Sequence, residues 1–503
     1  MRFHKILTTI AVGLFLSLAA SATVHAQSTL LPGLVAGDEP IVITKHVVKT
    51  VHGPIEYEAR AGRLAIRNDE TGEVHAHIFF VAYVAKNHGT NRPLTFIWNG
   101  GPTTPSLILH TQAFGPRRIT EQGFVDNAET LLASSDLVFY DPIETGFSRP
   151  EQPEFTKEFL TVLGDFAETA EFIRAYRARF TAEHQPLFLA GESYGSWRAS
   201  GTAELLAKRG DKINGVILIS GGVPGSLMPF EFTDGMSIQA RTAAAFVLNK
   251  LPPDLMRDRE ATMKAVNDWI VSTYMPVLSH VDKLSDTERE EIAKDLARFT
   301  GIHPDQVDRK TLVVSNLDYR KGLFDGDPAK LLNTYDMRIV GPTPPNSPES
   351  SRVIADYFRV ELGYSTDLAY AGLENGYMPV GGPPRRSTSS QWVYDHTPIT
   401  PELMARMHSG GGPPASQPWL QNAMRMEPNM RVFVVAGRYD TLNMCEGNLA
   451  MTAKLEPDVS KRFAHHCYEG GHMMYHDEPT RLKLSEDLAK FYADDASSSS
   501  NKH

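Results

Sequence analysis

The fold is decided by residues 186–195, which read PLFLAGESYG. The apolar first half predicts a buried strand, and the stretch from Tyr194 to about Lys208 predicts a helix. Gly191 to Gly195 between them fits G-x-S-x-G, a strand-to-helix turn that lifts a serine hydroxyl above the edge of a sheet. Because the positive end of the helix faces this turn, we expect Ser193 to be a nucleophile. The alternative is a serine in an ordinary strand–helix turn.

The surrounding sequence repeats the strand-then-helix pattern. Short apolar runs predict strands at residues 94–98, 136–140, 215–219 and 431–437. Apolar residues at three- and four-residue steps from Phe159 to Ile173 predict a long helix. Alternating strands and helices favour an α/β architecture with a mostly parallel central sheet flanked by helices. Residues 40–85 instead alternate as antiparallel strands, so we expect an antiparallel start to this sheet.

The strand signal fades between residues 224 and 397, where helix formers and Pro/Gly-rich loops dominate. We interpret 224–397 as a large, mainly helical cap insertion over one end of the sheet. It would divide the core domain into residues 27–223 and 398–493. The Ser-rich tail, residues 494–503, is predicted to be disordered.

The N-terminus is typical of a secretory signal. Basic Arg2 and Lys5 precede an apolar run to about Ala22, and small residues Val24 and Ala26 flank His25. We expect residues 1–26 to be a signal peptide cut after Ala26. The protein would then be exported, periplasmic or secreted, with no stable membrane insertion. The alternative is a retained N-terminal anchor.

Composition excludes several other classes. The 503 residues are 42% hydrophobic and 22% charged, as in a globular protein rather than a disordered or fibrous one. The net charge of −10 and the lack of a basic run argue against nucleic acid as a partner. The sequence has no phosphate loop and no dinucleotide fingerprint, so we expect no cofactor. Adjacent His465 and His466 would point to opposite faces of a strand, which argues against a shared metal.

A serine nucleophile needs a histidine base and a carboxylate that orients the histidine. In this architecture their order along the chain is Ser, acid, His. Asp440 comes just after the predicted strand that ends at Gly437, and His472 follows two glycines in GGHMM, residues 470–474. We therefore predict Asp440 as the acid and His472 as the base, with His465, His466 and His476 as competing histidines.

The only two cysteines, Cys445 and Cys467, lie between the predicted acid and base. In an exported protein such a pair suggests a disulfide, here a hypothesis that would tie the acid loop to the base loop. Closing a loop of this length stabilises the fold by about 3 kcal/mol in the chain-entropy model. The alternative is two separate buried thiols.

An acyl-transfer site also needs backbone N–H donors for the oxyanion. One is expected from Tyr194, the residue after the nucleophile, and the other from a glycine-rich loop after an earlier strand. Residues 98–102, WNGGP, supply such a loop directly after the strand predicted at 94–98. The alternative is a plain Gly-Pro turn.

Taken together, these segments resemble the serine carboxypeptidases, the peptidase S10 family of α/β-hydrolases, and in particular its bacterial branch. The resemblance covers most of the mature chain and rests on WNGGP (98–102), FGPRR (114–118), DPIETGFS (141–148), GESYG (191–195), Asp440 and the Gly-His-Met of 471–473. It implies an α/β-hydrolase fold, the triad Ser193, Asp440 and His472, and oxyanion donors at Gly101 and Tyr194.

The resemblance also implies that Asn99 and Glu192 bind the free C-terminal carboxylate of a peptide substrate. A Glu that serves in this way must keep its proton, so binding should favour acidic pH. The alternative for Glu192 is a structural hydrogen-bonding partner under the turn.

The chain departs from the family pattern at several positions. Thr103, Glu144 and Ser196 stand where the family usually has Gly, and Ala113 stands where eukaryotic members carry a second carboxylate-binding Glu. These departures leave the triad intact and bear on the substrate class.

Three functions are compatible with these residues. The first is an exported carboxypeptidase that releases C-terminal residues from peptides through an acyl-enzyme at Ser193. The second is an esterase or acyltransferase that uses the same triad, which a missing carboxylate contact favours. The third is a non-catalytic binding protein with a degenerate site, against which the intact Ser, Asp and His argue.

Overall fold

The computed structural model describes residues 27–28, 39–86, 89, 91–223, 229–341, 348–373, 388–398, 400–401, 404 and 417–500. The predicted signal peptide, residues 1–26, lies outside this part of the chain, as do residues 224–228 and 374–387 of the predicted insertion. No helix within these described ranges is long and apolar enough to cross a membrane.

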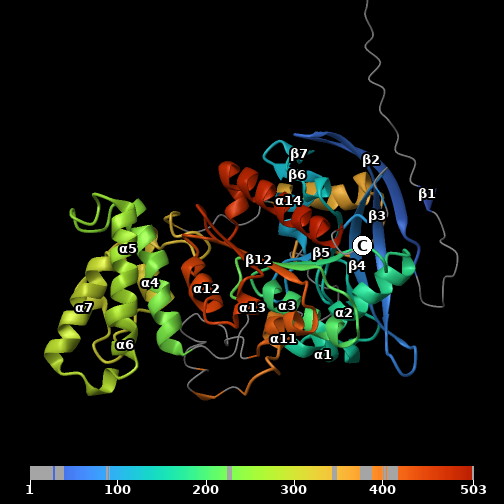
Figure 1. Cartoon of the computed structure of the whole chain (residues 1–503). Helices are drawn as coiled ribbons and strands as arrows, with labels where there is room; N and C mark the ends of the chain where they lie inside the picture. Colours follow the sequence, from blue (N-terminus) through green and yellow to red (C-terminus); the bar gives the residue numbers. More distant parts are fainter. Residues whose placement is uncertain are drawn as a thin grey trace, which may run out of the picture.

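A large twisted sheet runs through the middle of the molecule (Figure 1). Its strands lie in the order β1-β2-β3-β4-β8-β5-β10-β11-β12-β13, and β9 pairs with β4 at one side. The strands are β1 (Gln27–Ser28), β2 (Val42–Thr50), β3 (Gly53–Arg67), β4 (Val74–Ala85), β5 (Leu94–Trp98), β8 (Asp136–Tyr140), β9 (Arg149–Pro150), β10 (Leu187–Glu192), β11 (Gly215–Ile219), β12 (Arg431–Gly437) and β13 (Phe463–Tyr468). A separate hairpin joins β6 (Arg117–Thr120) and β7 (Gly123–Asp126).

The first strands of the sheet are antiparallel, and the pairs from β8 to β13 are parallel. This agrees with the antiparallel start and parallel continuation predicted from the sequence. The parallel order brings the carboxyl ends of β5, β10, β12 and β13 to one edge, where the loops that follow them meet.

Helices cover both faces of this sheet. The α-helices are α1 (Thr156–Phe159), α2 (Val162–Arg179), α3 (Gly195–Lys208), α4 (Phe230–Val247), α5 (Arg259–Trp269), α6 (Met275–Leu278), α7 (Asp286–Thr300), α8 (Asn316–Gly322), α9 (Pro348–Asp356), α11 (Trp419–Met426), α12 (Cys445–Thr452), α13 (Pro457–Ser460) and α14 (Glu478–Ser500). Short 3-10 or π-helical segments are η1 (Leu109–Phe114), η2 (Leu131–Ala133), η3 (Pro153–Phe155), η4 (Ile270–Tyr274), η5 (Val281–Lys283), η6 (Pro304–Gln306), η7 (Pro328–Lys330), η8 (Tyr357–Glu361), η9 (Thr388–Gln391) and η10 (Met474–His476).

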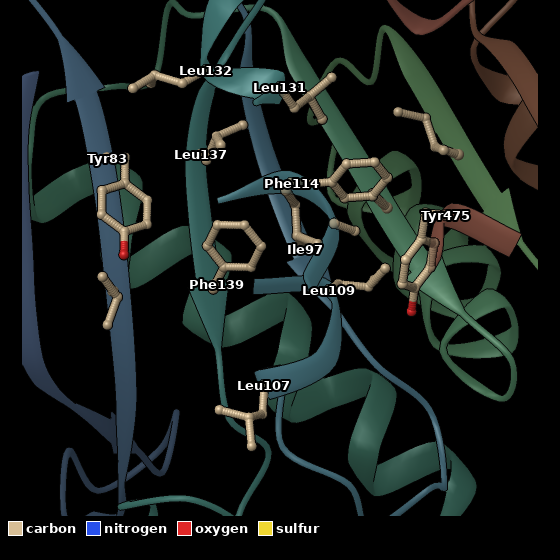
Figure 2. Close-up of a cluster of buried hydrophobic side chains, with 14 of the residues drawn as sticks. Tyr83, Ile97, Leu107, Leu109, Phe114, Leu131, Leu132, Leu137, Phe139 and Tyr475 are labelled. Atoms are coloured by element: carbon tan, nitrogen blue, oxygen red, sulfur yellow. The ribbon is translucent and has the colours of Figure 1, made fainter. Parts of the chain in front are cut away.

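Two hydrophobic cores lie on the two faces of the sheet because successive strand residues point to opposite sides. On β5, Ile97 joins the core with α14, η1 and η10, whereas Phe96 and Trp98 join the core with α2, α3 and α11. Part of the first core is shown in Figure 2, where Phe114 of η1 and Tyr475 of η10 lie near each other. A mostly parallel sheet with helices on both faces and a G-x-S-x-G turn after β10 is the α/β-hydrolase fold.

The chain between β11 and β12 builds a third hydrophobic cluster of its own. Helices α4 to α7 pack around it, and in Figure 1 they lie to the left of the sheet, beyond α12. Tyr439, two residues after β12, is buried in the same cluster, so these helices contact the main sheet through the loop that carries Asp440.

The C-terminal tail differs from the sequence expectation. We expected disorder from residue 494, but α14 continues through Ser500. Leu484, Leu488 and Phe491 anchor this helix in the core beside the sheet. Extending an existing helix avoids the free-energy cost of nucleating a new one, and serine has only a slightly unfavourable helix propensity.

Candidate active site

The predicted nucleophile sits in a strained turn between β10 and α3. Ser193 has a φ of 60°, in the left-handed region, and its backbone N–H donates to the Ile219 carbonyl at 2.8 Å. A Cβ on Gly191 would lie 2.0 Å from the Gly195 carbonyl oxygen, so only glycine fits at this position. The local sequence therefore forces the sharp turn that the G-x-S-x-G pattern predicts.

The predicted acid and base lie side by side at the same edge of the sheet. Asp440 Oδ2 is 2.7 Å from His472 Nδ1, and both side chains are buried. The Leu442 backbone N–H donates to the other Asp440 oxygen at 2.8 Å and fixes the carboxylate. Burial lowers the pKa of His472, but the nearby Asp440 and Glu192 carboxyls outweigh this and raise it overall. With Nδ1 bonded to Asp440, Nε2 is the nitrogen left for proton transfer.

The strand end after β11 connects the serine turn to the histidine loop. Ser220 Oγ donates to the His472 carbonyl, and the neighbouring Ile219 carbonyl accepts from Ser193. Among the hydrogen bonds of the described residues, none joins Ser193 Oγ to His472. Catalytic hydrogen bonds are often long before substrate binds.

The WNGGP loop lies directly on the serine turn. A Cβ on Gly100 would be 2.6 Å from both the Glu192 carbonyl oxygen and the Tyr194 nitrogen. Gly101 has a φ of 110°, which favours glycine. Within the described part of the chain, the backbone N–H groups of Gly101 and Tyr194 donate to no other group. Both predicted oxyanion donors are therefore available at this turn.

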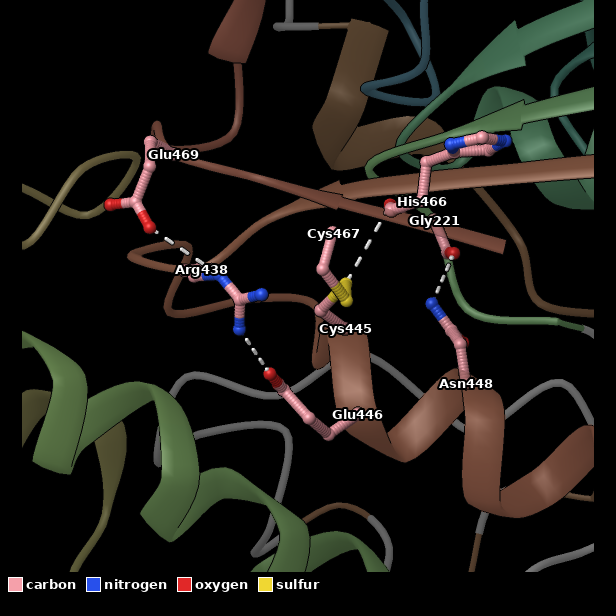
Figure 3. The surroundings of a disulfide bond; sticks show 8 residues. All are labelled: Gly221, Arg438, Cys445, Glu446, Asn448, His466, Cys467 and Glu469. Atoms are coloured by element: carbon pink, nitrogen blue, oxygen red, sulfur yellow. Dashed lines mark hydrogen bonds and ion pairs between the residues drawn. A yellow bond between two sulfur atoms is a disulfide. The ribbon is translucent and has the colours of Figure 1, made fainter. Parts of the chain in front are cut away.

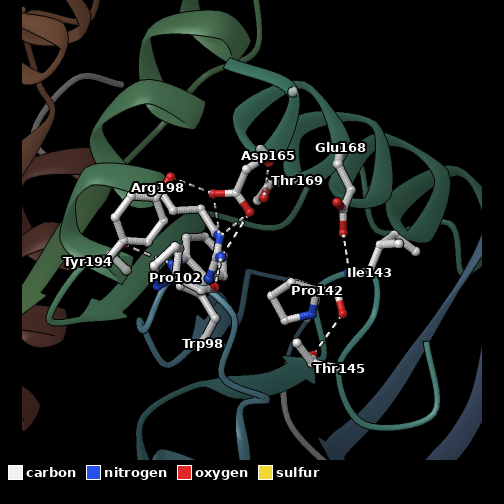
Figure 4. A network of polar contacts seen from close by, with 12 residues as sticks. Trp98, Pro102, Pro142, Ile143, Thr145, Asp165, Glu168, Thr169, Tyr194 and Arg198 are labelled. Carbon is white, nitrogen blue, oxygen red and sulfur yellow. Dashed lines mark hydrogen bonds and ion pairs between the residues drawn. The ribbon is translucent and has the colours of Figure 1, made fainter. Parts of the chain in front are cut away.

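A buried ion pair next to the WNGGP loop holds the loop in place (Figure 4). The Arg198 guanidinium of α3 is fully buried, contacts Asp165 of α2 at 2.8 Å, and donates to the Asn99 carbonyl at 2.9 Å and the Pro102 carbonyl at 3.1 Å. The Tyr194 hydroxyl donates to the same Asp165 at 3.0 Å. One carboxylate thus ties α2 and α3 to both segments that carry the oxyanion donors. This pair was not among the predicted site residues, and no spacing in the sequence indicates it.

Glu192 and Asn99, the predicted carboxylate-binding residues, contact each other. Asn99 Nδ2 donates to Glu192 Oε1 at 2.9 Å, and both side chains are buried. A third residue that sequence reasoning missed, Tyr475, donates its hydroxyl to Glu192 Oε2 at 2.5 Å. Burial raises the pKa of Glu192, although these two donors and His472 lower it. The carboxyl therefore holds its proton to higher pH than an ordinary Glu.

Another residue that was not predicted, Tyr335, comes from the region predicted as the insertion. Its carbonyl accepts the His472 N–H, and its ring lies 5.4 Å from the His472 ring. The Thr334 carbonyl next to it accepts from Thr441 at 2.6 Å, so this segment contacts both the acid and base loops. The Tyr335 side chain is 46% exposed and presents an aromatic surface beside the base.

Two departures from the family pattern are absorbed by the scaffold. Ser196 is fully buried, and its hydroxyl donates to the Gly191 carbonyl at 3.2 Å. Glu144 is buried at a φ of 69°, and the Thr156 hydroxyl lies 3.5 Å from its carboxylate. Both side chains thus have partners within the protein.

Cys445 and Cys467 form a disulfide, with their Cα atoms 5.6 Å apart (Figure 3). The disulfide joins the start of α12 to β13. The loop that carries Asp440 comes just before α12, and the loop that carries His472 comes just after β13. Beside it, Arg438 pairs with Glu446 at 2.7 Å and with Glu469 at 3.5 Å. Within the described ranges, the group with metal-ligand spacing is Cys445, Glu446 and Cys467, and the disulfide occupies both sulfurs.

Comparison with known proteins gives a family match over part of the chain. Residues 51–215 match the family model for Peptidase S10, serine carboxypeptidase. This segment contains Asn99, Gly101, Glu192 and Ser193 and ends before Asp440 and His472.

Curated relatives include fungal carboxypeptidases. The pheromone-processing carboxypeptidase KEX1 of Leptosphaeria maculans is 26% identical over 227 residues, 41% of this chain and 34% of that protein. A carboxypeptidase Y homolog of Arthroderma benhamiae is 31% identical over 140 residues, 27% of this chain and 26% of that protein. The chain thus matches about a third or less of the length of these relatives. Because they are fungal, they do not support the bacterial branch that we expected.

Solved structures give only a remote likeness. A proline iminopeptidase of Mycobacterium smegmatis has a TM-score of 0.38 at 12% identity, covering 87% of this chain and 99% of that one. Residues 51–215 are thus similar to the peptidase S10 serine carboxypeptidases, and the curated relatives that match this chain are carboxypeptidases too.

Proposed function

We propose that this chain is an exported serine carboxypeptidase that releases C-terminal residues from peptides through an acyl-enzyme at Ser193. The observation that carries the proposal is the buried Glu192 carboxyl directly before Ser193, bonded to Asn99. A carboxyl that keeps its proton is a donor for a substrate carboxylate, and the adjacent serine would then meet the last peptide bond.

The residues divide the reaction as follows. Nε2 of His472 accepts the Ser193 proton while the serine oxygen attacks the last peptide carbonyl, and Asp440 stabilises the imidazolium. The Gly101 and Tyr194 N–H groups receive the oxyanion. His472 then returns the proton to the leaving amine, and water releases the acyl group by the same steps in reverse. The Glu192–Asn99 pair decides where on the peptide this happens.

A paired assay tests the function. N-blocked dipeptides with a free C-terminus, the same peptides amidated, and short p-nitrophenyl esters are compared at acidic and neutral pH. We expect release of the last residue from the free-carboxylate peptides alone, and its loss in Ser193→Ala. Cleavage of esters without cleavage of peptides would instead assign ester or acyl-transfer chemistry. No activity, together with no labelling of Ser193 by a fluorophosphonate, would indicate a binding protein.

Export is supported by the N-terminal sequence and by the disulfide, which is typical of oxidising compartments. We propose the boundaries 1–26 for the signal peptide, 224–397 for the insertion, and 27–223 with 398–493 for the core. N-terminal sequencing of protein recovered outside the cytoplasm should start at Gln27. A chain that starts at Met1 would contradict the cleavage.

A further inference from the structure

Tyr475 is a buried residue that the proposed reaction has not used. It lies in η10, three residues after His472, and its side chain is completely buried. Its hydroxyl donates to Oε2 of Glu192 at 2.5 Å, while Asn99 donates to Oε1. Each oxygen of this carboxyl thus has one neutral donor from a different part of the chain.

The geometry around Glu192 is braced by η1. Asn99 Oδ1 accepts from the backbone N–H groups of Ile108 and Leu109 at 3.1 and 3.0 Å, so its amide nitrogen must face Glu192. At the other end of η1, Gln112 Oε1 lies 2.6 Å from His476 Nε2, next to Tyr475. The segment η1 therefore contacts Asn99 at one end and, through His476, the neighbour of Tyr475 at the other. In this way it helps to position both donors to Glu192.

Ala113 of η1 lines the same small cavity as Tyr475, whose other lining residues are apolar Phe114, Leu131, Leu484 and Leu488 and polar Glu129, Arg481 and Ser485. The phenol of Tyr475 is the hydrogen-bonding group that this side of the site supplies to the second carboxyl oxygen.

We propose that Tyr475 is a positioning residue that holds Glu192 for the substrate carboxylate and sets the pH above which free-carboxylate peptides no longer bind. The proposal rests on the proposed function and deepens it. A hydroxyl that donates to a carboxylate favours the ionised form. The other groups facing Glu192 are Asn99 and His472, which favour its ionised form, and Asp440, which opposes it.

Tyr475→Phe removes this donor and leaves the ring, so it should raise the pKa of Glu192. The carboxyl then stays protonated to higher pH. The pH at which KM for free-carboxylate peptides begins to rise should therefore increase by about one unit. The change should fall on the pH dependence of KM rather than on kcat, and p-nitrophenyl esters, which carry no C-terminal carboxylate, should show no such shift of KM with pH. Tyr468→Phe is the matched control, because Tyr468 is also buried and donates to a carboxylate, Asp487, at 2.7 Å away from this site.

A second measurement does not depend on turnover. Difference infrared spectroscopy over a pH titration follows the band of a protonated carboxyl, identified by its loss in Glu192→Gln. This band should titrate at higher pH in Tyr475→Phe than in the wild type and in Tyr468→Phe. If the wild type cleaves no free-carboxylate peptide, the proposed function fails, and an infrared shift still supports the role of Tyr475 at Glu192. An unmoved band, or one that moves to lower pH, overturns the inference.

Discussion

Asp165 and Glu192 are two fully buried carboxyl groups beside the same turn, and their surroundings are opposite. Asp165 meets the Arg198 guanidinium at 2.8 Å. Glu192 is hydrogen-bonded by an amide and a phenol. In the first arrangement the Arg198 guanidinium lowers the pKa of Asp165 against the rise that burial causes, and the ion pair makes a rigid scaffold. The second leaves the proton exchangeable, which suits the proposed recognition of a substrate carboxylate by Glu192.

Tyr194 links the two arrangements. Its hydroxyl bonds to Asp165, while its backbone N–H is a candidate oxyanion donor two residues after Glu192. Burial raises the pKa of both carboxyls, so burial alone does not assign a role to an acid, and the two groups differ in the partners that they meet.

Neutralising Asp165 should have the largest effect. Asp165→Asn leaves Arg198 buried without its counterion, so we expect the free energy of unfolding to fall by about 3–5 kcal/mol. Urea denaturation measures the change. The double variant Asp165→Leu/Arg198→Met, which removes both charges, should recover part of the loss. A change below about 1 kcal/mol in Asp165→Asn would remove the contrast with Glu192.

Gly100→Ala tests the contact between the WNGGP loop and the serine turn. The new methyl has no room against the backbone of Glu192 and Tyr194, so the loop must move away with Asn99 and Gly101. We expect kcat to fall by about 100-fold, as for the loss of one oxyanion donor. Gly222→Ala is the matched control, since no atom of the residues that the structure describes lies within 4 Å of a Cβ there. Equal activity in the two variants would contradict the placement of the loop.

Glu192→Gln is the counterpart of Asp165→Asn and should barely affect folding. The amide keeps the shape of a protonated carboxyl, so the free energy of unfolding should change by about 1 kcal/mol or less. For free-carboxylate peptides, KM should be higher at acidic pH and nearly independent of pH. Urea denaturation and a KM profile measure both effects. A loss as large as that of Asp165→Asn would mean that Glu192 is a structural anion.

The smallest expected effect is in the pH profile of the wild type. Activity on free-carboxylate peptides should fall at low pH through kcat and at high pH through KM. Because the pKa of His472 is raised, kcat falls as pH drops through it and the base becomes protonated. Because the pKa of Glu192 is also raised, KM for free-carboxylate peptides increases as pH rises past it. Esters should show only the His472 limb. Stopped assays on both substrate classes measure this, and an alkaline limb with esters would argue against Glu192 as its cause.

Much of the sheet could be predicted because its signals are local. The runs at 94–98, 136–140, 215–219 and 431–437 become β5, β8, β11 and β12 with the same bounds. Strand β13 was not among these predicted runs. It is an edge strand whose residues are mostly half-buried, so its sequence lacks the strong apolar signal of the central strands.

The sequence alone determined the serine turn, because the glycines at 191 and 195 and the serine between them act on adjacent backbone. It also indicated Asp440 and His472, since each follows directly from a strand end or a glycine pair. Only the tertiary structure decided which groups surround Glu192. Tyr475 lies 283 residues from Glu192 along the chain, and its contact depends on how η1 packs against η10. Such contacts leave no periodic trace in one sequence, because they arise from packing rather than from spacing.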